Sequence, residues 1–333
     1  SVGALALWLF INPEVRLDDS GLRILWQLIK GTLAGVVLLV GCVLAFKRRA
    51  GIVLLHGGVA LMMFSELWTG LTATEGNMTI FEGQSSSYTY DLRSTELAIV
   101  DKSPADVDRV TVVPDQLLRD SGTAISHPDL PFNIEVVEFF INSRLRDPES
   151  GEANPADSGA GEHVVVEPLD TSAGVAGGEV DQPSVYVHLS HKQSGDPLGT
   201  YLLSTAAYGA TSATQGVYLP AETVAVDGKS YDVSLRFARK YRDYRLSLVD
   251  FRFDRYVATN KPKNYSSLVR LQDAERNVDR DVLIWMNNPL RYRGETFYQA
   301  DYDAETEQAT VLQVVSNPGW MIPYVACMLA ATG

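Results

Sequence analysis

His56 is the one ionisable residue in an otherwise apolar stretch, "GIVLLHGGVALMMF", which runs from Gly51 to Phe64. A neutral imidazole there can ligate a metal or hydrogen-bond to a neighbouring helix, and either use offsets the cost of apolar surroundings. Gly57 and Gly58 follow directly, so little side-chain bulk stands beside the ring, and a helix or a flat ligand can approach. The residues alone leave ligand binding and helix packing open.

The other residues with metal-binding or catalytic chemistry do not form a recognisable site. His188 and His191 are three positions apart in a predicted strand, which places them on opposite faces. Cys42 and Cys327 lie in apolar segments, and the absence of CxxC and CxxCH excludes a dithiol centre and a c-type cytochrome. No nucleophile, base and oxyanion hole occur in a known combination, so no catalytic residue is predicted.

Two long apolar segments are expected to position His56. Residues 25–46 contain Lys30 as their single charge, near one end where its side chain can reach the headgroups, and are predicted to be a transmembrane helix. Residues 47–50 then form a short basic turn. Residues 51–71 are predicted to be a second transmembrane helix, which bears His56.

Both ends of the chain are predicted to be cut membrane helices. Residues 1–11 are interpreted as the end of one transmembrane helix, followed by an outer loop over 12–24. Residues 320–333 are interpreted as the start of a C-terminal transmembrane helix, because about 20 residues are needed to cross a bilayer. We therefore expect this sequence to be a fragment of a longer, multi-pass membrane protein.

The basic turn predicts the orientation. "KRR" at 47–49 is the densest basic cluster beside a membrane segment, which places 47–50 in the cytoplasm and 72–319 outside it. From residue 72 onward the chain has 22 Lys and Arg against 37 Asp and Glu. Such an acidic domain predicts no nucleic-acid partner. The expected location is the bacterial cytoplasmic (inner) membrane, with the large domain on the periplasmic side.

Residues 72–319 are predicted to be a mostly β domain, a sandwich or an open barrel. Turn-rich pieces separate short alternating or β-branched runs, among them "FNIEVVEFFI", "SVYVHLS", "YDVSLRF" and "YRLSLVDFRFDRY". Residues 146–182 are rich in Gly, Ala, Ser, Pro and acids. We expect them to form a mobile insertion, because they offer too little apolar surface to order themselves.

Three segments follow one another near the C-terminus. They are "KPKNYSSLVRLQD" (261–273), "DVLIWMNNPLRYRGETFYQADYD" (281–303) and "TVLQVVSNPGWMIPYVACML" (310–329). They predict a strand, a turn at Asn288-Pro289, a bend at Gly294, an aromatic strand, and a strand that enters a membrane helix through "NPGW".

Together with "HGGVALMMFSELWTGL…MTIFEGQ" (56–84), these segments resemble the ResB family, the membrane component of System II cytochrome c biogenesis. The family occurs as a separate protein or as the ResB part of a fused CcsBA-type protein. The matching residues are Tyr265, Ser267, Asn287, Pro289, Leu290, Tyr292, Gly294, Phe297, Tyr298, Gln299, Asn317, Pro318 and Gly319.

This resemblance implies a non-catalytic, haem-handling subunit or portion of a cytochrome c synthase. Such a subunit helps carry haem across the membrane and present it for covalent attachment. His56 matches the family's membrane histidine, which implies an axial ligand to the iron of a transient, transported haem b. Imidazole suits that role because a neutral nitrogen can ligate iron in an apolar setting.

The implied partners are a ResC/CcsA-type haem-attachment membrane protein, separate or fused, which supplies the second haem ligand, and apocytochrome c. A thiol-reducing thioredoxin-like protein and membrane lipid complete the set. The alternative function is a haem-free, membrane-anchored β-domain that acts as an adhesion or sensor module, with His56 only packed against another helix.

Overall fold

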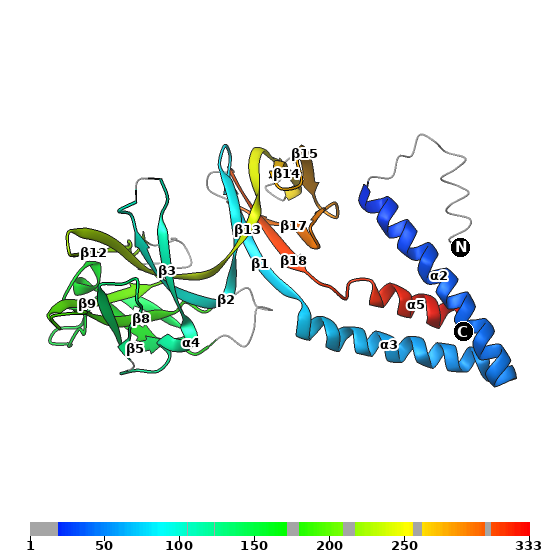
Figure 1. Ribbon diagram of the computed structural model, residues 1–333, viewed down its shortest axis with the longest axis horizontal. Helices are drawn as coiled ribbons and strands as arrows, with labels where there is room; N and C mark the ends of the chain where they lie inside the picture. Colours follow the sequence, from blue (N-terminus) through cyan, green and yellow to red (C-terminus); the bar gives the residue numbers. More distant parts are fainter. Residues whose placement is uncertain are drawn as a thin grey trace. The chain divides into compact units, whose positions relative to one another are not determined.

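The computed structural model describes residues 19–104, 106–122, 124–171, 180–208, 217–255, 262–303 and 308–333 (Figure 1). The predicted helix over 1–11 and the first part of the predicted outer loop lie outside the described residues. The remainder of that loop is helical, because α2 already begins at Asp19.

Three helices include the apolar stretches of the sequence: α2 (Asp19–Phe46), α3 (Ala50–Thr72) and α5 (Ile322–Thr332). The basic 3-10 turn η1 (Lys47–Arg49) separates α2 from α3. The chain reverses at the basic turn, where Lys47 has a left-handed φ of 52°. Among the described residues, α3 is the one helix long and apolar enough to cross a membrane; Leu33–Phe46 and α5 are shorter apolar helices. A multi-helix membrane part therefore stays a prediction.

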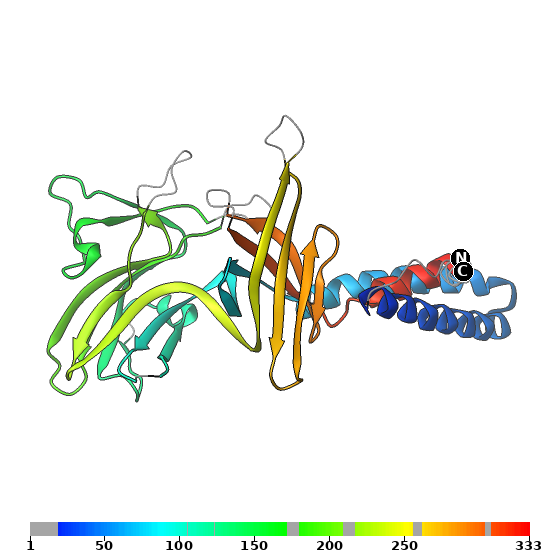
Figure 2. The same ribbon diagram turned by 90° about the horizontal axis from the view of Figure 1, so that it is seen from above.

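Helix α5 lies along α3, and α2 packs against both of them (Figures 1 and 2). Gly35 of α2 faces Leu329 and Thr332 of α5, at ordinary van der Waals distances from where a Cβ would stand. The single histidine of the apolar stretch is therefore held on one helix of a small helical bundle.

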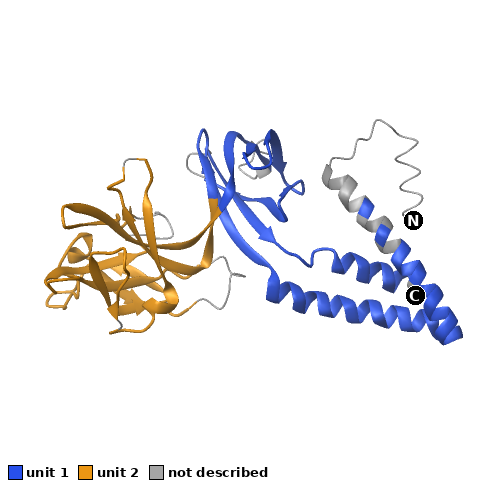
Figure 3. Ribbon diagram, in the orientation of Figure 1, with its two compact units in different colours: residues 1–87, 242–333 blue, residues 88–241 orange. Residues whose placement is uncertain are grey.

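The chain forms two compact units, coloured separately in Figure 3. Unit 1 comprises Ser1–Ser87 and Arg242–Gly333, and unit 2 comprises Tyr88–Tyr241. Strands β2 (Ser85–Asp101) and β13 (Lys229–Arg255) each contain one of these boundaries, so both strands contribute residues to each unit.

Unit 1 contains the helices α2, α3 and α5 and a strongly curved antiparallel sheet. Its sheet order is β15-β14-β13-β2-β1-β18-β17-β16, and a bridge between Trp285 and Asn288 brings its two ends together, so the sheet is nearly closed. Met78, Leu246 and Phe297 are among the buried side chains inside it. The remaining strands are β1 (Thr74–Phe81), β14 (Pro262–Asp273), β15 (Val278–Trp285), β16 (Leu290–Tyr292), β17 (Glu295–Tyr302) and β18 (Ala309–Ser316).

Unit 2 contains two packed sheets, so the prediction of a mostly β domain is confirmed in both units. Buried residues of both sheets, such as Leu97, Phe132 and Val187, form one apolar core between them. One sheet comprises β3 (Arg109–Pro114), β12 (Glu222–Val226) and parts of β2 and β13; the other comprises β4 (Ala124–Ile125), β5 (Phe132–Phe140), β8 (Ser184–His191) and β9 (Pro197–Ser204). Smaller elements are α4 (Asp115–Leu118) and the pair β10 (Ala207–Tyr208) and β11 (Val217–Tyr218).

The prediction that 146–182 is a mobile insertion is wrong for residues 146–171. Strand β6 (Ser143–Arg146) pairs with β7 (Val165–Pro168), and a 3-10 turn η2 (Ala160–His163) precedes β7. The segment covers the second face of the β8–β9 sheet, where Ala156 and Val164 pack with Tyr186 and Leu202. Residues 172–179 lie outside the described part of the chain.

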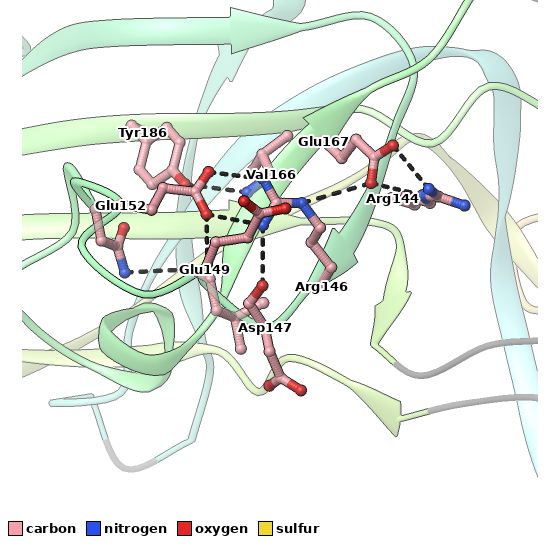
Figure 4. Close-up of polar contacts among 10 residues, drawn as sticks. Arg144, Arg146, Asp147, Glu149, Glu152, Val166, Glu167 and Tyr186 are labelled. Atoms are coloured by element: carbon pink, nitrogen blue, oxygen red, sulfur yellow. Dashed lines mark hydrogen bonds and ion pairs between the residues drawn. The ribbon is translucent and has the colours of Figure 1, made fainter.

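Polar contacts also hold this segment, as the close-up in Figure 4 shows. Arg146 binds Glu152 in a bidentate pair at 2.6 and 2.8 Å, and Arg144 binds Glu167 in the same way at 2.7 and 2.9 Å. The backbone N–H of Glu149 donates to Glu152 at 2.8 Å. These contacts, first of all that with Arg146, lower the pKa of Glu152 to about 2. These ion pairs and hydrogen bonds thus add to the few apolar contacts that Ala156 and Val164 make.

Candidate functional site

His56 lies on an exposed face of α3, and a hydrogen bond within its own helix orients the ring. Its Nδ1 is 2.8 Å from the backbone carbonyl oxygen of Ile52, one helical turn earlier. A carbonyl oxygen only accepts, so Nδ1 carries the proton in the neutral ring. The lone pair is therefore on Nε2, which has no hydrogen-bond partner among the described residues.

The two glycines after His56 have different surroundings. A Cβ at Gly58 would lie 2.7 to 3.0 Å from Ala330 and 2.8 Å from the carbonyl oxygen of Ala326, so this glycine permits the close approach of α5. A Cβ at Gly57 would meet nothing within 4 Å. Of the two, Gly57 is the one that leaves space beside the imidazole.

The helix face that bears His56 is apolar and uncovered. Ile52 and Leu67 are each 61% exposed and Met63 is 71% exposed, and Ala60 is exposed between them. Leu54 and Gly58, on the opposite face, are buried. An exposed apolar strip of this kind marks a surface for lipid, for another protein or for a ligand.

The site can supply one nitrogen ligand from this chain. Among the described residues, no group of three or more His, Cys, Asp or Glu side chains is placed to hold a metal ion. Glu66, the acidic residue of α3, is exposed and ten positions further along the helix. Iron in a haem already has four ring nitrogens, so a single axial imidazole is a sufficient contribution from one protein.

The residues of the three C-terminal segments contact one another in unit 1. These contacts explain why polar, aromatic or small residues stand at the matching positions. The Oγ of buried Ser267 donates to Gln299 Oε1 at 2.6 Å, and both side chains contact Thr310 Oγ1 at 2.8 Å. This network satisfies polar groups inside the curved sheet. Leu290 and Phe297 are cross-strand partners in the core. These residues position the sheet rather than perform chemistry.

Tyr292 and Arg293 both bind a buried carboxylate. The Tyr292 hydroxyl donates to Asp273 Oδ2 at 2.6 Å, and Arg293 Nε lies 3.0 Å from the same oxygen. The hydrogen bond from Tyr292, with the nearby guanidinium, lowers the pKa of Asp273, whereas desolvation raises the pKa of Tyr292. Gly294, with φ 81°, completes the tight turn predicted at this position.

A second buried ion pair was not predicted from the sequence. Arg242 binds both carboxylate oxygens of Glu295 at 2.6 and 2.8 Å, and the Tyr244 hydroxyl donates to the same carboxylate. Burial and the contact with Glu295 raise the pKa of Tyr244. No sequence signal reveals this pair, because the partners are 53 positions apart on different strands.

The "NPGW" turn connects the sheet to the helices. The Asn317 side chain accepts a hydrogen bond from the Gly319 N–H at 2.8 Å and donates to Thr69 Oγ1 at 3.4 Å. A Cβ at Gly319 would lie 2.6 Å from the ring of Trp68, so a glycine is needed for this approach. The turn thus joins the start of α5 to the end of α3.

The other histidine pair does not face a common ion. His188 Nδ1 contacts Thr200 Oγ1 at 3.1 Å, whereas His191 Nε2 contacts Asp227 at 3.3 Å. The two rings therefore have separate hydrogen-bond partners.

The comparison with known families gives one clear match. The sequence model of the ResB-like family matches residues 200–311. Over this segment the chain is similar to the ResB-like family. The resemblance identified from Tyr265 to Gln299 is thereby confirmed. The match also includes 200–260, which no sequence motif had assigned, whereas 51–84 and the "NPGW" segment lie outside it.

A relative supports the same assignment. The chain is 32% identical to Protein NrfI of Wolinella succinogenes over 115 residues, which are 34% of this chain and 13% of that protein. The chain therefore spans a small part of the length of this relative.

Proposed function

We propose that this chain is a haem-handling membrane component of cytochrome c biogenesis and that His56 is an axial ligand to the haem iron. The ResB family is related to cytochrome c biogenesis. The observation that supports the finer proposal is the arrangement at His56: the N–H of Nδ1 is bound to Ile52 and Nε2 is open.

This arrangement is the one that metal-ligating histidines commonly have. Their second ring nitrogen donates to a carboxylate, a backbone carbonyl or water, which fixes the tautomer and the ring orientation. At His56 a backbone carbonyl has this role. The ring is neutral in this tautomer, so it can lie in an apolar environment and still present a lone pair to iron.

In this proposal α3 crosses the bacterial cytoplasmic membrane as part of a multi-pass protein, and residues 72–319 are on the periplasmic side. The apolar strip around His56 then faces a ResC/CcsA-type partner, separate or fused, which supplies the second ligand. Transient haem b is the cargo, and apocytochrome c receives it after a thioredoxin-like protein has reduced the apocytochrome disulfide to two thiols. This chain contributes no catalytic residue.

The test is the absorption of copurified haem in detergent-purified protein. His56→Gly should lower the Soret band about tenfold or more, because the single ligand from this chain is lost. Added imidazole should restore part of the band, because Gly57 leaves open space beside the vacated position. His56→Gln is the matched control: it keeps a polar side chain of similar size but no imidazole.

The variants distinguish ligation from packing. A packed histidine predicts a normal Soret band and normal cytochrome c maturation in His56→Gln, and no response of the glycine variant to imidazole. Either result in protein of wild-type abundance contradicts the proposed ligation. A haem-free wild type would instead favour an adhesion or sensor module.

A further inference from the structure

A polar pocket in unit 1 lies where the curved sheet meets the start of α5. Arg291, Thr296 and Tyr298 line it from β16 and β17, and Trp320 and Tyr324 line it from the "NPGW" turn and α5. Arg291 alternates with Leu290 and Tyr292, which pack in the core, so its side chain is on the outer face of the sheet. The pocket is distinct from the His56 face.

Arg291 has no acidic partner in the described chain. Its described side-chain contacts are two. Nη1 lies 3.2 Å from Thr296 Oγ1, and the guanidinium carbon lies 5.3 Å from the centre of the Trp320 ring. A guanidinium has five N–H donors, so most of them remain available. The hydroxyls of Tyr298 and Tyr324 and the indole N–H of Trp320 also have no partner among the described residues.

The one acid in the pocket does not cancel this charge. Glu295 lines the pocket, but Arg242 and Tyr244 bind its carboxylate on the inner side. Arg242 and Glu295 thus form a closed pair with side chains 8% and 12% exposed. The pocket therefore presents mainly the hydrogen-bond donors of Arg291 and of the aromatic residues. Such donors suit an anion with several acceptor oxygens.

The position of the pocket along the helices indicates which anion. The turn that contains Trp320 is bound to the end of α3 through Asn317 and Thr69. Trp68 and Tyr324 lie near this end of the helices, as aromatic residues do at a membrane surface. With α3 crossing the membrane, as the proposed function has it, the pocket is at the level of the lipid headgroups.

We propose that this pocket binds the phosphate of an anionic phospholipid headgroup. The Arg291 guanidinium binds the phosphate oxygens, Trp320 and Tyr324 contact the glycerol and the adjoining acyl chain, and Tyr298 donates a further hydrogen bond. The bound lipid stabilises the junction between the β-domain and the helices.

The test is native mass spectrometry of the full chain in detergent, with phosphatidylglycerol added. Arg291→Gln should weaken lipid retention about fivefold, the effect of about 1 kcal/mol for one basic side chain near a membrane surface. Arg280→Gln removes the same charge from an exposed position of β15 and should leave retention unchanged. No haem is needed, so the outcome does not depend on the role of His56.

Two results would overturn the proposal. Equal retention by the Arg291 and Arg280 variants would show that the pocket holds no lipid. Displacement of phosphatidylglycerol by inorganic phosphate would assign the site to soluble anions. Should Arg291→Gln fail to fold, Trp320→Leu tests the pocket from its other side, and unchanged retention there also contradicts lipid binding.

Discussion

Unit 2 places apolar side chains on both faces of its β8–β9 sheet, one face against the opposite sheet and the other under residues 146–171. Unit 1 instead leaves the apolar face of α3 exposed, whereas polar groups are buried in both units, such as Ser267 in unit 1 and Ser184 in unit 2. The two groups on which the proposals rest, His56 Nε2 and the donors of Arg291, both belong to unit 1. Both proposed sites are therefore in unit 1, and the side chains of unit 2 described above contribute to its core.

The largest effect is expected from the core of unit 2. Phe132 is fully buried and meets Tyr231 edge to face, with ring centres 5.5 Å apart. Phe132→Ala should lower the free energy of unfolding by about 3–5 kcal/mol, measured by denaturant titration of the full chain. Phe81→Ala, at a position 44% exposed in unit 1, should change it by about 0.5 kcal/mol at most. Equal losses would contradict the contrast between the units.

A smaller effect is expected where α3 meets α5. Gly58→Ala should destabilise the helices by about 1–3 kcal/mol, because the new methyl group meets the backbone of α5 and this outweighs the better helix propensity of alanine. Gly57→Ala, one position earlier, should be neutral or slightly stabilising. Thermal unfolding in detergent measures both. Identical melting of the two variants would show that α5 does not pack at Gly58.

The smallest effect is expected from pH in the ordered insertion. The pKa of Glu152 is lowered from 4.5 to about 2, so its contribution is fully present above about pH 4.5 and is lost as the pH falls toward 2. The Glu149 amide should exchange faster at pH 3 than at pH 6, after correction for intrinsic rates. Arg146→Gln should remove this pH dependence and Arg144→Gln should keep it. An unchanged amide in all three proteins would refute the role of Glu152.

Strand content was predictable from sequence because alternation depends on neighbouring residues. The run "FNIEVVEFFI" correctly predicted β5, and "NPLRYRG" predicted the turns around β16. The runs "YDVSLRF" and "YRLSLVDFRFDRY" suggested two strands, and the structure joins them in β13. Polar residues between them do not interrupt β13, because the buried side chain of Arg242 binds Glu295 and its neighbour Tyr241 is exposed.

The ordered insertion was not predictable from composition. Asn154 donates to the carbonyl oxygens of Gly161, Glu162 and Val164, which closes a loop that has few apolar residues. A Cβ at Gly161 would lie 2.5 Å from the side chain of Leu202, 41 positions later. Such contacts depend on distant partners, which composition does not report. The candidate site was also predicted only in part. The sequence indicated His56, but it did not show that Nδ1 is the nitrogen that carries the proton.

The hydrogen bond from His56 to Ile52 has a further consequence for the entropy of ligand binding. A free imidazole on a helix surface loses rotational freedom when it binds a ligand, and that loss weakens binding. Here the ring is already restrained by its own helix, so the loss occurs on folding rather than on binding. Because α5 packs against Gly58, the direction of the Nε2 lone pair also follows the crossing of α3 and α5. A small rotation of α3 against α5 would therefore turn Nε2 with it.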